Sequence, residues 1–175
     1  MSPVIVAAFE KQGAQELFTS KAYLAMAYWS EVKHWSGYAK LFHLQADEEQ
    51  AHARKIFEHL VDRDVIPTIG AVGAATSNFG SLVDIAKAAY DLERANTASI
   101  HALYELALAE KDYAAQIFLH EFIAEQVEEE AWTDKLLEKT RQAACSGAQF
   151  NFDRHVVKEV LGEAPAGARN SALTN

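Results

Sequence analysis

The chain contains a single cysteine, Cys145, among its 175 residues. One cysteine cannot form a disulfide within the chain, and it cannot build the cysteine cages that hold zinc or iron–sulfur clusters. We therefore expect a protein of a reducing compartment, where disulfides are rare.

Positive charge is also scarce, with 16 Lys and Arg residues against 25 Asp and Glu residues and a formal net charge of −9. Binding to a phosphate backbone needs clustered positive charge, so we expect no nucleic-acid partner. The first residues (MSPVIVAAFEK) lack the cationic region of a signal peptide, and there is no run of 18 apolar residues, so we expect no membrane segment. These absences favour the cytoplasm, or the stroma of an organelle after removal of a transit peptide.

Proline and glycine are few as well, at three and eight residues. Much of the chain is rich in Ala, Leu, Glu and Lys with helical periodicity, which predicts one all-α domain over residues 1–162. Residues 163–175 are small and polar and predict a flexible tail. Ser2, Ser81 and Asp112 are the expected N-caps. The predicted helices cover residues about 3–32, 36–63, 81–109, 112–142 and 150–161.

The connections between the long helices predict their topology. The first and second helices, and likewise the third and fourth, are joined by short links, which makes each pair an antiparallel hairpin. Residues 64–80 form a 17-residue link that reaches about 55 Å when extended, whereas helices of this length measure about 40 Å. The link can therefore run the length of the molecule, which predicts a four-helix bundle with one long crossover and a short fifth helix.

The inward stripe of each long helix is apolar at its ends and polar in its middle. The two hairpins match in register, since Glu49 lies 33 residues after Glu16 and Gln126 lies 33 residues after Glu93. We therefore expect the polar side chains to meet at one level of the bundle. The main polar positions are Gln12, Glu16, Gln45, Glu49, His52, Glu93, Asn96, Gln126 and Glu129.

Four carboxylates at one level of a core indicate a cation site. No Lys or Arg lies on the inward stripes, and unpaired buried carboxylates cost many kcal/mol or become protonated. Four carboxylates and one imidazole, with Glu49 and His52 one turn apart, suit two divalent ions bridged by a carboxylate. Hard oxygen donors with one nitrogen favour Fe, Mn or, less selectively, Zn.

Four segments carry a resemblance to a known family: ELFTSKAY (16–23), DEEQAH (47–52), YDLE (90–93) and EQVEE (125–129). Together they resemble the ferritins, and more closely the non-haem ferritins of prokaryotes and some algae. The likeness extends over about residues 3–162. It implies the ferritin-like bundle, a homo-oligomeric cage of 24 subunits and storage of iron as a ferric mineral.

The same resemblance implies a ferroxidase centre that oxidises Fe(II) with O₂ or H₂O₂. Carried over by position, Glu16, Glu49 and His52 would bind the first iron. Glu49 would bridge the two irons, and Glu93 with Glu129 would complete the second position.

Two neighbouring residues take roles by resemblance. Gln126 is expected to hydrogen-bond to the centre, and Tyr23 to donate an electron or a hydrogen bond, with a purely structural core aromatic as the alternative. No haem is expected, because Gln50 stands where the haem-containing bacterioferritins place a methionine.

A third iron site is expected on the cavity side of the centre. Glu48, Glu125 and Glu128 each precede an inward-facing residue and point about 100° round the helix from it. The resemblance implies that they bind a third iron and share Glu129. The alternative is an acidic face exposed to solvent.

Two other function classes remain open at the level of sequence. A di-metal carboxylate oxygenase or peroxidase on the same bundle would act on an organic substrate or a peroxide and would store no mineral. A metal-free helical adaptor that oligomerises would tolerate loss of the central carboxylates.

Overall fold

The computed structural model describes residues 1–162, which are helical with short connections and contain no strand in that range. The tail predicted at 163–175 lies outside the described residues. None of the helices described is both long and apolar enough to cross a membrane. The helices are α1 (Pro3–Val32), α2 (Ser36–Val61), α3 (Leu82–Ala109), α4 (Tyr113–Gln142), α5 (Ser146–Asp153) and α6 (Val156–Leu161).

Three of the four long helices begin at the predicted N-caps. Ser2, Ser81 and Asp112 each accept, through a side-chain oxygen, the backbone N–H three residues later, at 3.5, 3.2 and 3.1 Å. Pro3 is the first residue of α1, where its missing N–H needs no partner. The predicted starts at 81 and 112 are therefore cap positions, one residue before the helices themselves.

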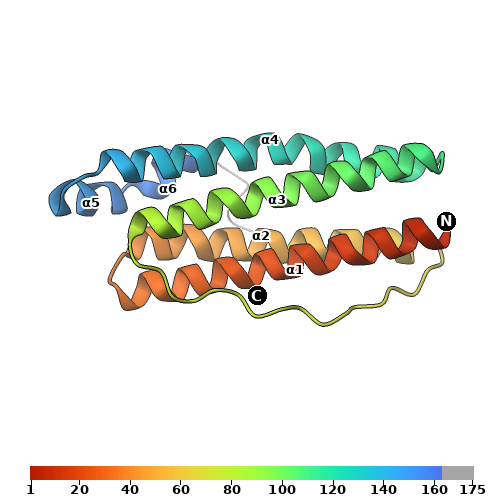
Figure 1. Ribbon diagram of the computed structural model, residues 1–175, viewed down its shortest axis with the longest axis horizontal. Helices are drawn as coiled ribbons and strands as arrows, with labels where there is room; N and C mark the ends of the chain where they lie inside the picture. Colours follow the sequence, from red (N-terminus) through yellow and green to blue (C-terminus); the bar gives the residue numbers. More distant parts are fainter. Residues whose placement is uncertain (163–175) are drawn as a thin grey trace, which may run out of the picture.

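The helix ends form tight turns without glycine. His34, Asp64 and Lys111 follow α1, α2 and α3 with φ values of 62°, 59° and 56°. After each of them the next N–H bonds to a carbonyl five residues earlier, as from Trp35 to Ser30 at 2.8 Å. Such left-handed turns satisfy the last carbonyls of a helix and reverse the chain within a few residues. They give α1 with α2, and α3 with α4, their antiparallel pairing (Figure 1).

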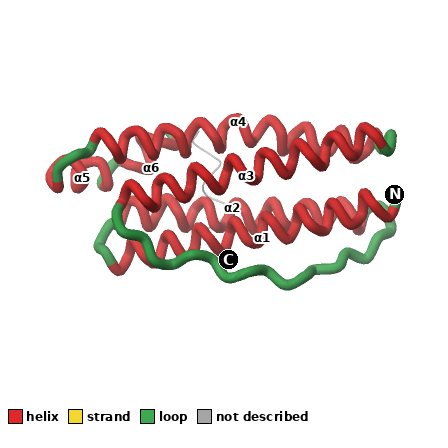
Figure 2. The backbone as a smooth tube through the Cα atoms, viewed as in Figure 1, coloured by secondary structure: helices red, strands yellow, loops and turns green. Residues whose placement is uncertain are grey.

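The crossover from α2 to α3 runs along the outside of α1 from one end of the bundle to the other (Figure 2). Its backbone is attached to side chains of α1 at three successive points, so both segments run in the same direction. Consequently α2 and α3 are parallel, as the length of the link predicts. The three contacts join Glu10 to Thr68 N–H (2.6 Å), Lys21 to the Gly73 carbonyl (3.1 Å) and Trp29 to the Phe79 carbonyl (3.1 Å).

The core divides into two apolar clusters separated by a polar layer. One cluster contains Tyr23, Phe42 and Leu136, and the other contains Phe9 and Leu119. The middle of every long helix contributes buried polar side chains between them, as the interrupted stripes predict. The polar layer contains Gln12, Glu16, Gln45, Glu49, His52, Glu93, Asn96, Gln126, Glu129 and Thr133.

The single helix predicted at 150–161 is wrong, since this part of the chain forms α5 and α6 with a break at Arg154 and His155. The reason is a tertiary contact. Asp153 is buried, and its Oδ1 accepts the N–H groups of Gly37 and Tyr38 at 2.9 and 3.0 Å. Trp35, the N-cap of α2, makes no side-chain cap bond, so a carboxylate from α5 satisfies this helix start.

Candidate metal centre

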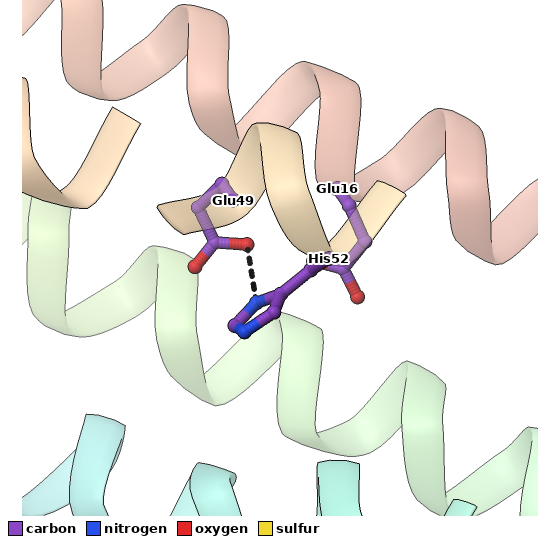
Figure 3. A group of neighbouring side chains, drawn as sticks. All are labelled: Glu16, Glu49 and His52. Atoms are coloured by element: carbon purple, nitrogen blue, oxygen red, sulfur yellow. Dashed lines mark ion pairs between the residues drawn. The ribbon is translucent and has the colours of Figure 1, made fainter. Parts of the chain in front are cut away.

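Two overlapping groups of potential ligands occupy the polar layer. Glu16, Glu49 and His52 offer one ligand atom each within 4.8 Å of one another, and so do Glu49, Glu93 and Glu129. Figure 3 shows the first group, with Glu16 projecting from α1 and the other two from α2. Glu49 belongs to both groups, so the arrangement provides two adjacent positions with a shared carboxylate.

The four long helices all contribute to this site, and all of the ligands are buried. Glu16, Glu49 and Glu93 have no exposed surface, while Glu129 and His52 are exposed by 6% and 9%. None of the ion pairs found among residues 1–162 joins a lysine or arginine to one of these carboxylates. Within residues 1–162, the acidic layer therefore has no Lys or Arg as an ion-pair partner.

The carboxylate of Glu16 is held by two buried amides. Gln12, one turn earlier on α1, donates to Oε1 at 2.7 Å, and Asn96 on α3 donates to Oε2 at 2.9 Å. Gln12 also donates to Asn96 Oδ1 at 2.8 Å and accepts a hydrogen bond from the Ser99 hydroxyl. This network orients Glu16 across the bundle before any metal binds.

The second group is held by aromatic donors. The Tyr23 hydroxyl donates to Glu93 Oε1 at 2.5 Å, and the Trp132 indole N–H donates to Glu129 Oε2. The two rings are neighbours, with centroids 6.1 Å apart. Gln126 lies beside them with its amide 3.4 Å from Glu93 Oε2. Glu93 and Glu129 thus each have one oxygen that accepts a hydrogen bond from an aromatic side chain.

Glu49 differs from the other three, because neither of its buried oxygens has a hydrogen-bond partner in the described chain. His52 Nδ1 lies 3.5 Å from Glu49 Oε2, which is a loose contact (Figure 3). Burial, with Glu93 and Glu16 as negative neighbours, raises the pKa of Glu49 well above its usual range. An unsatisfied carboxylate between two ligand groups is the arrangement that a pair of bound cations would relieve.

Burial also shifts the other carboxylates of the second group. It raises the pKa of Glu93 to about 7, although the hydrogen bond from Tyr23 lowers this pKa in part. It raises the pKa of Glu129 to about 9, with the Glu93 charge adding to the effect and Trp132 opposing it. In the metal-free protein Glu93 and Glu129 therefore hold a proton more readily than exposed glutamates do, and a metal ion would displace it.

Comparison with known proteins identifies the family. The family described as "Ferritin-like domain" matches residues 6–143, most of the chain. The chain belongs to the ferritin family. A bacterial non-heme ferritin of Staphylococcus aureus (strain MRSA252) is 36% identical over 164 residues, covering 93% of this chain and 99% of the relative. One of Bacteroides fragilis (strain 638R) is 31% identical over 143 residues, covering 82% of this chain and 90% of the relative.

Solved ferritin structures agree with this assignment. The open-pore ferritin of the archaeon Archaeoglobus fulgidus superposes with a TM-score of 0.87 at 31% sequence identity. The match covers 89% of this chain and 97% of the archaeal one. It confirms the ferritin-like bundle that the sequence predicts.

The residues predicted to form a third site of this ferritin are not assembled into a compact group. Glu48 and Glu128 are exposed, and Glu48 accepts a hydrogen bond from Gln45 at 3.1 Å. Glu125 is half-buried, with one oxygen 3.5 Å from His52 Nε2. Within residues 1–162, only the two groups that contain Glu49 bring three such ligand atoms together. The third site therefore stays a prediction.

Three supporting residues of this ferritin centre were given no role by sequence reasoning: Gln12, Asn96 and Trp132. Gln12 and Asn96 lie on the interrupted stripes one turn from a ligand, and this position was their only signal. Trp132 lies three residues after Glu129, which places it on the same face of α4. A buried tryptophan also needs an acceptor for its N–H, so the spacing was a usable signal.

Proposed function

We propose that the protein is an iron-storage ferritin that oxidises Fe(II) within each subunit. The observation that supports this proposal most strongly is the environment of Glu49. Both of its buried oxygens lack a hydrogen-bond partner, and it belongs to both ligand groups. A carboxylate shared by two positions holds two metal ions about 3.5–4 Å apart in two-metal sites. Two ferrous ions at that distance can both react with one O₂.

The ligands divide between the two ions as follows. Glu16, Glu49 and His52 bind the first Fe(II), and Glu49, Glu93 and Glu129 bind the second. Four carboxylates stabilise Fe(III) more than Fe(II) by charge alone, which favours loss of an electron from each ion. The names of the bacterial non-heme ferritins among the relatives support iron as the metal.

The reaction consumes two Fe(II) ions for each O₂. Each iron loses one electron, and O₂ takes up both electrons and two protons to leave as H₂O₂. Where H₂O₂ is the oxidant, it takes up two electrons and two protons and leaves as two water molecules. Each Fe(III) then combines with two waters and releases three protons as it enters a mineral of composition FeOOH.

Two further residues border the reaction. The hydrogen bond from the Tyr23 hydroxyl to Glu93 supports a role for Tyr23 in orienting that ligand. Gln126 also contacts Glu93, with its amide nitrogen 3.4 Å from the backbone carbonyl oxygen and from Oε2 of Glu93. On the cavity side, Glu48, Glu125 and Glu128 bind a third iron after the first two. No haem takes part.

The mineral needs an enclosed space, and the resemblance to the ferritins implies a cage of 24 subunits, so we propose a closed homo-oligomer of that size. At 19.3 kDa for one chain, its protein shell would have a mass of about 460 kDa. The match of this chain to nearly the full length of the S. aureus ferritin supports the proposal.

The test combines particle size with iron uptake. Light scattering should give a particle of about 460 kDa, and Fe(II) added in air, but not under argon, should form a ferric core inside it. A monomer or dimer that oxidises Fe(II) without a core would favour the oxygenase or peroxidase alternative. An oligomer that binds no iron would favour the metal-free adaptor.

A further inference from the structure

Trp132 connects the second metal position to the apolar core. It lies one turn after Glu129 on α4, is only 5% exposed, and donates its indole N–H to Glu129 Oε2. Its ring packs beside Tyr23 within the cluster that also contains Leu136. The indole is therefore a fixed donor, since rotating it would disrupt the packing of the cluster.

This contact uses one lone-pair direction of Glu129 Oε2 and leaves Oε1 with no hydrogen bond among the described residues. A carboxylate shared between the second and third irons would use one oxygen for each, so one of the ions would have to bind Oε2 beside the fixed indole N–H. A cation there would face the positive end of the N–H dipole and draw charge from Oε2, which weakens the hydrogen bond, and hydrogen bonds to a charged carboxylate are among the stronger ones. Binding of a third metal and the hydrogen bond from Trp132 therefore oppose each other.

We propose that Trp132 is a positioning residue that restricts Glu129 to the second metal position and so favours two bound metals over three. This inference rests on the proposed di-metal centre. It makes Trp132 the residue that determines whether the third site fills together with the first two or only at higher metal concentration.

The experiment is a calorimetric titration of the assembled, metal-free protein with Zn(II), which is not oxidised. Trp132→Phe keeps an aromatic ring but removes the N–H donor and part of the indole volume, and the control variant shares both changes. Trp29→Phe is the matched control, because Trp29 also donates its N–H, to the Phe79 carbonyl at 3.1 Å, but takes no part in the centre. The wild type and Trp29→Phe should bind two Zn(II) per subunit tightly and a third weakly.

In Trp132→Phe the third Zn(II) should bind at least about tenfold more tightly, which is the lower end of what a hydrogen bond to a charged group contributes. Adding Glu125→Ala and Glu128→Ala should abolish this gain, which assigns it to the third site. Affinities equal to those of Trp29→Phe would overturn the inference. A wild type that binds no Zn(II) at the centre would instead overturn the proposed function.

A second measurement leaves Trp132 in place and does not depend on whether Trp132→Phe folds. The chain has three tryptophans, so the double variant Trp29→Phe/Trp35→Phe leaves Trp132 as the sole indole emitter. Its emission should change most when the third Zn(II) binds, because the hydrogen bond from its indole N–H to Glu129 is weakened at that step. Emission that responds to the first two equivalents and not to the third would contradict the inference.

Discussion

Asn96 on α3 donates a hydrogen bond of 2.9 Å to Glu16 on the neighbouring helix α1. Both side chains are fully buried, and the other oxygen of Glu16 is taken by Gln12. Glu16 is therefore the ligand whose orientation is set most completely before a metal arrives. Glu49, with no hydrogen-bond partner, is the least restrained of the four carboxylates.

This relationship predicts that Asn96→Ala weakens the first metal position selectively. Loss of a group that orients a metal ligand lowers affinity by about 10–100-fold. Calorimetry with Zn(II) should show that loss for the first site and little change for the second. Asn151→Ala, at an exposed position of α5, is the control and should leave both sites unchanged. Equal weakening of both sites would mean that Asn96 supports the fold rather than Glu16.

Replacement of the shared ligand should stop catalysis without destroying the particle. Glu49→Ala is expected to slow the first phase of Fe(II) oxidation by about 100-fold or more, since it removes a ligand from both positions. Its metal-free melting temperature should equal or exceed that of the wild type, because a buried unpaired carboxylate is removed. Stopped-flow absorbance after two Fe(II) per subunit is the measurement, with the exposed Glu58→Ala on the same helix as control. An unchanged initial rate would refute the assigned centre.

The metal-free protein should become less stable as the pH rises. The folded-state pKa values of Glu93 (about 7) and Glu129 (about 9) lie above the value of about 4.3 for an unfolded glutamate. The folded state then holds more protons than the unfolded state between these values. The contribution of these groups to stability is present below about pH 4 and is lost as the pH rises through the folded pKa values. In the presence of a chelator, the melting temperature should fall from pH 6 to pH 9.

Glu129→Gln supplies the control for that pH dependence, because its amide does not titrate. The fall in melting temperature between pH 6 and pH 9 should be smaller in this variant than in the wild type. A wild-type melting temperature that rises over this interval, or an equal fall in both proteins, would contradict the assigned protonation states.

The glutamates on the cavity side should affect the iron that binds after the first two ions. They should not affect the first fast phase of Fe(II) oxidation. In Glu125→Ala/Glu128→Ala the main ligands survive, so the initial oxidation rate should be unchanged. Iron bound per subunit before mineral forms should fall from about three to about two. Anomalous scattering from crystals soaked anaerobically with Fe(II) counts the sites. Two anomalous peaks per subunit in the wild type at every Fe(II) dose would show that these glutamates only form an acidic face exposed to solvent. Exposed charges of this kind contribute little to stability.

The contact between Gly37 and α5 should not tolerate a side chain. A Cβ on Gly37 would lie 1.6 Å from the Asp153 carbonyl oxygen, so α5 would have to move and its carboxylate would leave the start of α2. Gly37→Ala should lower the free energy of unfolding by about 2–4 kcal/mol, from overpacking together with loss of the cap. Gly147→Ala is the control, since a Cβ there has nothing within 4 Å. Thermal unfolding measures the loss of stability, and limited proteolysis of the chain after residue 143 measures the displacement of α5. A Gly37→Ala protein as stable as the control would contradict the prediction.

The sequence by itself determined the bundle and the composition of its central layer. Helix periodicity and the N-caps Ser2, Ser81 and Asp112 are local properties of the chain, and they survive in the structure unchanged. The equal 33-residue spacing within each hairpin placed Glu16, Glu49 and their counterparts at one level, because antiparallel helices joined by short turns have a defined register.

Only the tertiary structure decided which groups hold those carboxylates. The bond from Trp132 to Glu129, the amides on Glu16 and the break after Asp153 depend on side-chain rotamers and on contacts between helices. Helix periodicity specifies which face a residue occupies, and it carries no information about which of two carboxylate oxygens a neighbour will reach. That choice is made by close packing, in which each buried donor takes the nearest acceptor left by all the others.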